Sequence, residues 1–124
     1  MARGQQSQPR EPVASFFEGE RQELRWRYAY RPEFVPLLME YVGAQPGMHI
    51  LEVGCGTGFL SRLLAQTLAD VRVVGLEPNE KSLNLGHQLL ERQKLTNVAL
   101  QHGAAYPMPF PDEAFDLVTS QTVL

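Results

Sequence analysis

Three glycines at alternate positions, Gly54, Gly56 and Gly58, follow an apolar run that carries one acid, Glu52. Glycine lets a backbone turn sharply and approach a ligand without a Cβ atom in the way. The exposed N–H groups at the start of a following helix favour an anionic or electron-rich group. The pattern therefore predicts a strand, a tight ligand-binding loop and a helix, in that order.

A second acid, Glu77, ends the next apolar run, 19 residues after Gly58. Doubly wound folds place an acid at this point, where it accepts hydrogen bonds from ribose hydroxyls. The alternative is a solvated carboxylate at the end of a strand, but the glycine loop upstream favours a ligand. Phe59 stands where the dinucleotide fingerprint needs its third glycine, which argues against NAD, and no Lys-Ser or Lys-Thr pair follows to make a P-loop.

The elements that must position these residues follow from apolar periodicity. Strands are expected over 49–53, 71–76, 97–101 and 115–120, with helices between them. The helix after the glycine loop should bury its leucines and turn Arg62 and Gln66 to water. The next helix should begin after a cap at Asn79 and run to about Arg92, with Gly86 allowing close packing on the sheet. An earlier helix is expected to pack on the sheet through Phe34, Leu37, Leu38, Tyr41 and Val42.

Composition limits the classes of function. A chain of 124 residues holds at most one domain, and 44% hydrophobic with 20% charged residues is typical of a globular protein. The net charge of −3 gives no general attraction to nucleic acid or to an anionic membrane. One cysteine, Cys55, can form neither an internal disulfide nor a Cys-rich zinc site, which indicates the cytoplasm. No stretch approaches the roughly 20 apolar residues of a membrane span, and no metal site is expected.

The stretch 52–58, Glu-Val-Gly-Cys-Gly-Thr-Gly, resembles motif I of the class I S-adenosylmethionine-dependent methyltransferases, and is similar to the small-molecule branch often called type 11. Two later stretches, 73–79 and 109–118, resemble the family at matching intervals, so that the resemblance covers the chain from about Phe34 to Leu124. It implies an α/β fold with a Rossmann-like doubly wound parallel sheet. Four strands in the order 3-2-1-4 of the family's seven would be present.

The resemblance also implies roles for individual residues, with S-adenosylmethionine as the cofactor. The three glycines of the loop would pass under its methionine and ribose portions, Glu52 would orient its amino-acid end, and Glu77 would hold its ribose. Adenine would lie at Ala104, where the family commonly has Asp, a hydrogen-bond acceptor that alanine lacks. The full set of expected cofactor-binding residues is Glu52, Gly54, Cys55, Gly56, Thr57, Gly58, Glu77, Pro78, Ala104, Ala105, Ser120 and Gln121. No catalytic residue is identified.

Three segments are expected along the chain. Residues 1–12 are predicted to be a disordered lead-in, 13–31 an aromatic and basic segment that caps or closes over the domain, and 32–124 the amino-terminal part of a methyltransferase domain. The expected activity is methyl transfer to a small-molecule acceptor, with no nucleic-acid or membrane partner. Two alternatives stay open: a fragment that only binds the cofactor, and a NAD-dependent oxidoreductase. The oligomeric state is not predicted.

Overall fold

The computed structural model describes residues 31–120. In chain order its elements are the 3-10 turn η1 (Pro32–Phe34), helix α2 (Val35–Val42), strand β1 (His49–Val53), helix α3 (Phe59–Thr67), strand β2 (Arg72–Glu77), helix α4 (Glu80–Gln93), strand β3 (Val98–His102) and strand β4 (Leu117–Ser120). The predicted lead-in over 1–12, nearly all of the segment over 13–31, and Gln121 lie outside the described residues.

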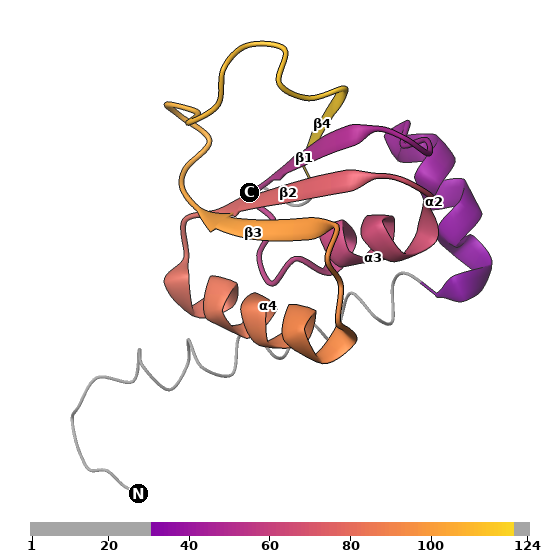
Figure 1. Ribbon diagram of the computed structural model, residues 1–124, viewed down its shortest axis with the longest axis horizontal. Coiled ribbons are helices and arrows are strands. Elements are labelled where there is room, and N and C mark those ends of the chain that lie inside the picture. Colours follow the sequence, from indigo (N-terminus) through magenta and orange to yellow (C-terminus); the bar gives the residue numbers. More distant parts are fainter. Residues whose placement is uncertain (1–30, 121–124) are drawn as a thin grey trace, which may run out of the picture.

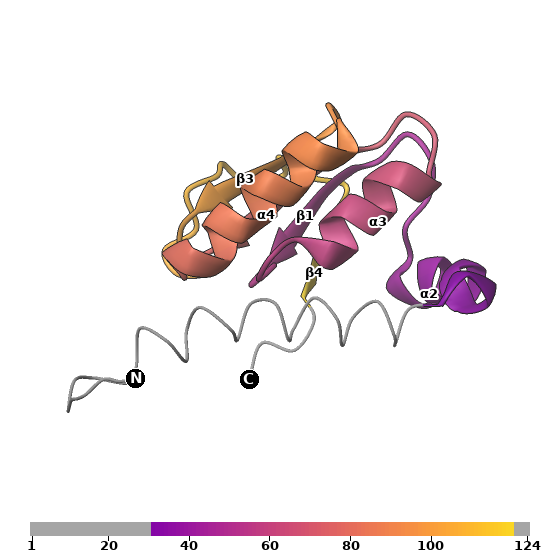
Figure 2. The ribbon, with the colours of Figure 1, turned by 90° about the horizontal axis from the view of Figure 1, so that it is seen from below.

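The strands form one parallel sheet in the order β3-β2-β1-β4, which confirms the predicted order (Figure 1). Helix α3 connects β1 to β2, and α4 connects β2 to β3; both helices lie on the same side of the sheet (Figure 2). Right-handed crossovers between neighbouring parallel strands give this arrangement. The carboxyl ends of all the strands therefore lie at one edge, where the glycine loop also begins.

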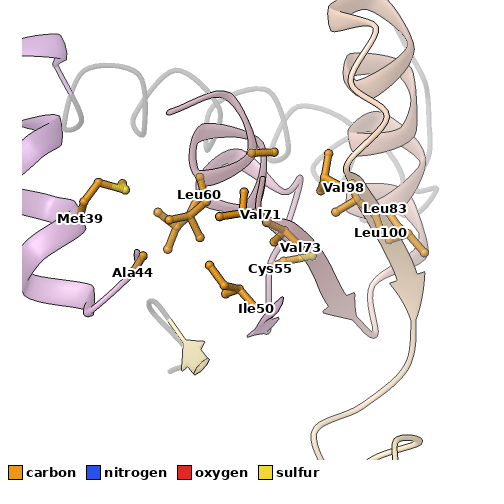
Figure 3. Close-up of a cluster of buried hydrophobic side chains, with 12 residues drawn as sticks. Met39, Ala44, Ile50, Cys55, Leu60, Val71, Val73, Leu83, Val98 and Leu100 are labelled. Carbon is orange, nitrogen blue, oxygen red and sulfur yellow. The ribbon is translucent and has the colours of Figure 1, made fainter. Parts of the chain in front are cut away.

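Apolar side chains cover both faces of the sheet. The larger cluster lies on the face that carries the helices (Figure 3), and its members are Met39, Ala44, Ile50, Cys55, Leu60, Leu64, Ala65, Val71, Val73, Leu83, Val98 and Leu100. On the other face Leu51, Val53 and Leu76 are buried, with Phe110 and Phe115 of the β3–β4 connection packed near them. Burial on both faces accounts for the nearly continuous apolar runs of β1 and β2.

Helix α4 confirms two predictions. The Asn79 side chain caps it by accepting a hydrogen bond from the backbone N–H of Ser82 at 3.0 Å. A Cβ atom on Gly86 would lie only 2.6 Å from the Thr57 carbonyl oxygen and 2.6 Å from Leu100 Cδ1. Glycine at this position therefore allows the helix to approach both the glycine loop and the sheet.

The predicted buried stripe of α2 is wrong for Phe34, Leu37 and Tyr41, whose side chains are exposed. The prediction holds for Leu38 and Val42, which are partly buried against the core, and the same face holds the buried Met39 and the partly buried Val35. These residues follow the same helical spacing, shifted along the chain. Phe34 falls in η1 rather than in α2, so it does not share the periodicity of the helix.

The prediction that Arg62 faces water is also wrong, because this side chain is only 3% exposed. Its Nη1 donates to Oε1 of Gln93, the last residue of α4, at 3.2 Å, and its guanidinium lies 5.5 Å from the centre of the Phe59 ring. Helix α3 is flanked by α4 as well as by the sheet, so a side of α3 that periodicity assigns to solvent is shielded. Gln66 is exposed, as predicted.

The strands β2, β3 and β4 begin later than predicted, by one or two residues. The largest shift is in β4, which starts at Leu117 rather than at Phe115. The ring of Phe115 packs on the His49 ring with centroids 4.7 Å apart, and the Asp116 carboxylate accepts from the His49 backbone N–H at 2.8 Å. These contacts attach the entry of β4 to the start of β1 before regular pairing begins.

Candidate functional site

The glycine loop joins β1 to α3 and is held against the end of β2. The Leu76 carbonyl oxygen accepts from the N–H groups of Gly54, at 2.8 Å, and Cys55, at 3.1 Å. Gly58 has a left-handed φ of 82°, and a Cβ atom there would lie 2.9 Å from Leu100. Both the backbone conformation and the lack of space therefore require glycine at this position.

Glu77 closes the loop from the neighbouring strand. Its Oε1 accepts a hydrogen bond from the Gly56 backbone N–H at 2.7 Å, and its Oε2 accepts from the Asn79 N–H at 2.9 Å. The residue is 9% exposed, so the alternative of a freely solvated carboxylate does not hold. A carboxylate oxygen has two lone pairs, which leaves each oxygen of Glu77 able to accept one further hydrogen bond from a ligand hydroxyl.

Glu52 lies one strand away in a different environment. It is 2% exposed, and its Oε1 accepts a hydrogen bond from the Ser61 hydroxyl at 2.7 Å. Burial raises the pKa of this carboxyl group to about 8; the Ser61 hydrogen bonds and the Arg62 charge oppose that shift, and the charge of Glu77 adds to it. At neutral pH Glu52 is therefore mostly protonated in the ligand-free protein.

Three further predicted residues lie in the loop or just after β2. Thr57 is fully buried, and Cys55 is 6% exposed beneath the loop. Burial raises the pKa of the Cys55 thiol, so it stays protonated and is a poor nucleophile. Pro78 is exposed, and its carbonyl oxygen lies 3.1 Å from Nε2 of His102 at the end of β3.

The predicted adenine-side residues follow β3. The Gly103 N–H donates to the Glu77 carbonyl oxygen at 3.1 Å, which places the start of this segment beside Glu77. Ala104 and Ala105 are both exposed. Ser120 ends β4, is exposed, and pairs with Val53 at the end of β1.

The structure thus brings most predicted residues to one edge of the sheet. Glu52 is near the end of β1, Glu77 ends β2, and Ser120 ends β4. Gly103 directly follows β3, and the glycine loop lies at the same edge. Within residues 31–120, no group of three or more His, Cys, Asp or Glu side chains could hold a metal ion. In the same range, no helix is long and apolar enough to cross a membrane.

Sequence reasoning missed two supporting residues, Ser61 and His102. Ser61 lies three residues before Leu64 and seven before Leu68, so its place on the buried side of α3 was available from periodicity. A polar residue on such a stripe needs a buried partner, and the acid Glu52 was the obvious one. His102 gave no comparable signal, because its contact with Pro78 depends on how β2 and β3 pair.

The chain is similar in sequence to a known family and to a curated protein. The family model described as "Methyltransferase domain" matches residues 50–124, more than half of the chain. The demethylmenaquinone methyltransferase of Listeria welshimeri is 38% identical over 82 residues, which are 65% of this chain and 35% of that protein. The chain therefore spans about a third of that relative's length.

Two solved structures share the fold. The PH0226 protein of Pyrococcus horikoshii OT3 is 30% identical with a TM-score of 0.62, covering 78% of this chain and 42% of that one. Coclaurine N-methyltransferase, solved with N-methylheliamine and SAH, is 23% identical with a TM-score of 0.63, covering 71% and 26%. Together with the family match, the strand order and the glycine loop, these findings place the chain in the class I S-adenosylmethionine-dependent methyltransferase family.

Proposed function

We propose that the chain binds S-adenosylmethionine at the carboxyl edge of its sheet, as part of an enzyme that methylates a small molecule. The observation that carries this proposal is the hydrogen bond from the Gly56 N–H to Glu77. It joins the loop that would lie under the methionine portion to the acid that would hold the ribose. One ligand with an amino-acid end and a nucleoside end would span both.

The proposed placement assigns a role to each group at the edge. The loop from Gly54 to Gly58 offers a backbone surface with little side-chain bulk, and Glu77 offers two carboxylate oxygens to ribose hydroxyls. Glu52 would face the amino-acid end, with Cys55, Thr57 and Pro78 shaping the walls. Ala104 and Ala105 would border the adenine, and Ser120 and Gln121 the methyl group.

Bound S-adenosylmethionine supplies a methyl group on a positively charged sulfur, open to in-line displacement by an acceptor's lone pair. Such a displacement needs little acid or base assistance, so the protein contributes chiefly by aligning donor and acceptor. The absence of a predicted catalytic residue is consistent with that requirement. The related demethylmenaquinone and coclaurine methyltransferases support an acceptor that is a small molecule.

We also propose the cytoplasm as the site of action, which the single cysteine favours. Residues 32–124 are proposed to be the amino-terminal part of the methyltransferase domain. The lead-in over 1–12 and the capping segment over 13–31 remain predictions. Methyl transfer is proposed for the complete enzyme that contains this sequence, and cofactor binding for the chain itself.

Calorimetric titration tests the binding. The chain should bind S-adenosylmethionine and S-adenosylhomocysteine but not NADH. Replacing Glu77 by alanine should weaken both by about 1–3 kcal/mol, because a buried charged acceptor is lost. Glu91→Ala, at an exposed position of α4, is the matched control and should bind like the parent. Binding of NADH alone, or an unchanged affinity of Glu77→Ala, would contradict the proposal.

A further inference from the structure

Ser61 connects the two sides of the glycine loop. It lies in the first turn of α3 and is fully buried, and its hydroxyl donates to Oε1 of Glu52 on β1 at 2.7 Å. Glu52 and Ser61 therefore form a fixed pair directly behind the loop.

This pair links α3 to β1 at a helix start that has no side-chain cap. The first four N–H groups of a helix lack partners within the helix, and a side chain at the N-cap usually accepts one of them. The N-cap of α3 is Gly58, which has no side chain to do so. The Ser61 hydroxyl instead joins the first turn of α3 to Glu52 of β1, so the start of the helix and the end of the strand are held together.

The charged and titratable groups facing Glu52 come from three elements. Glu77 belongs to β2, Arg62 to α3 and Cys55 to the loop. Burial opposes a charge on Glu52 most strongly, and Glu77 adds repulsion, whereas Ser61 and Arg62 favour the charged form. A positive charge bound beside Glu52 would therefore lower the pKa of its carboxyl group and favour loss of the proton.

We propose that Ser61 is a positioning residue that holds Glu52 toward the α-ammonium group of the cofactor's amino-acid end, so that cofactor binding releases the Glu52 proton to solvent. The inference rests on the proposed function, because it requires the cofactor at the glycine loop. A ligand that prefers the ionised carboxylate must bind more tightly as the pH rises, until the free protein has itself lost the proton. The Ser61 hydrogen bond lowers the pKa of Glu52 and therefore lowers the pH above which binding stops tightening.

Proton release can be measured by titrating S-adenosylhomocysteine calorimetrically in buffers of different ionisation enthalpy, from pH 6 to pH 9. Wild type should release up to about one proton, and the release should fall away above about pH 8, where free Glu52 ionises. Glu52→Gln should abolish this component and leave only any proton that the ligand itself loses. That variant therefore provides the baseline for every other measurement.

Ser61→Ala tests the positioning role. Loss of a hydrogen bond to a carboxylate should move the end of the release upward by about 1–2 pH units. Ser82→Ala, at the equivalent first turn of α4, should behave like wild type. A Ser61→Ala variant that binds more weakly by the same factor at every pH would overturn the positioning role, because a merely structural residue gives that result.

Wild type alone also decides the proposal, whether or not Ser61→Ala folds. Binding of S-adenosylhomocysteine with no more proton release than in Glu52→Gln would overturn the inference and leave the proposed function intact. Failure of wild type to bind the ligand at any pH would overturn the proposed function, and the inference with it.

Discussion

The carboxyl ends of β1 and β2 carry the same residue type in contrasting surroundings. Glu52 is enclosed behind the glycine loop and accepts a hydrogen bond from the Ser61 hydroxyl. Glu77 lies at the edge of the loop and accepts hydrogen bonds from two backbone N–H groups, those of Gly56 and Asn79. The comparison shows that position in a motif does not determine how an acid is used. The donors around each carboxyl group and its access to solvent do.

The two environments indicate different roles for the two acids. Glu77 fixes the shape of the loop through its backbone contacts and presents its remaining lone pairs at the edge of the sheet. Glu52 holds a proton at neutral pH and joins β1 to α3, so its charge depends on what binds next to it. Substituting each acid by glutamine, which is similar in shape, should therefore have opposite effects.

The largest effect is expected from Glu52→Gln on stability. Burial raises the pKa of Glu52 from 4.5 to about 8, so the folded chain keeps a proton that the unfolded chain loses above about pH 4.5. The stability that this group contributes is complete below that pH and is lost as the pH rises to about 8. Glutamine cannot ionise, so the variant should exceed wild type in unfolding free energy by roughly 2–4 kcal/mol at pH 7–8.

Urea unfolding at pH 5, 6, 7 and 8 measures this difference. The advantage of Glu52→Gln should be small at pH 5 and grow with each step. Glu91→Gln, at an exposed position on α4, controls for a general change in charge and should show no such trend. Equal stability of Glu52→Gln and wild type across the series would mean that Glu52 is not buried as the structure shows.

Glu77→Gln should lower the stability, by about 1–3 kcal/mol. An amide has one oxygen, so its NH2 group would face one of the two backbone N–H groups that Glu77 now accepts. Urea unfolding of the variant and the parent measures this loss. A stabilising effect that follows the pH would erase the distinction between the two acids.

The smallest effect is expected at Ala104, beyond both acids. If adenine lies beside it, Ala104→Asp adds an acceptor for the adenine amino group and should tighten cofactor binding by about 0.5–1.5 kcal/mol. The preference for adenosine over inosine analogues should increase as well. Competition binding with both analogues measures it, and equal affinities in the parent and the variant would show that this segment does not recognise the base.

The parallel sheet, and the meeting of the candidate residues at one edge of it, could be predicted because those features depend on local patterns. The tight loop follows from the alternating glycines after an apolar strand, because glycine permits a sharp turn of the backbone. The acid at the end of the next strand reaches the same edge because neighbouring parallel strands end there. Neither inference requires knowledge of distant contacts. The close packing at Gly86 was also predictable, because glycine lowers the helix propensity and is usually kept inside a helix where a larger side chain would not fit.

The wrong predictions of burial concern helix residues whose exposure depends on contacts that helical periodicity does not give. Arg62 was assigned to solvent because its helix was considered against the sheet alone, while α4 covers that side through Gln93. Tyr41 and Leu37 were assigned to the core because two adjacent apolar stripes fit α2, and only the packed structure selects the one that contains Met39. Likewise, the network around Glu52 depends on the exact approach of α3, which periodicity does not give.

A crystal structure of the chain with S-adenosylhomocysteine would show directly whether the cofactor binds at the carboxyl edge of the sheet. The ribose hydroxyls should lie within hydrogen-bonding distance of Glu77, and the amino-acid end should lie over the loop from Gly54 to Gly58, on the side nearest Glu52. The Gly56 to Glu77 hydrogen bond should persist, because the ligand uses the lone pairs that this contact leaves available. Ligand density away from the carboxyl edge of the sheet, or a nucleoside that does not contact Glu77, would contradict the proposed placement.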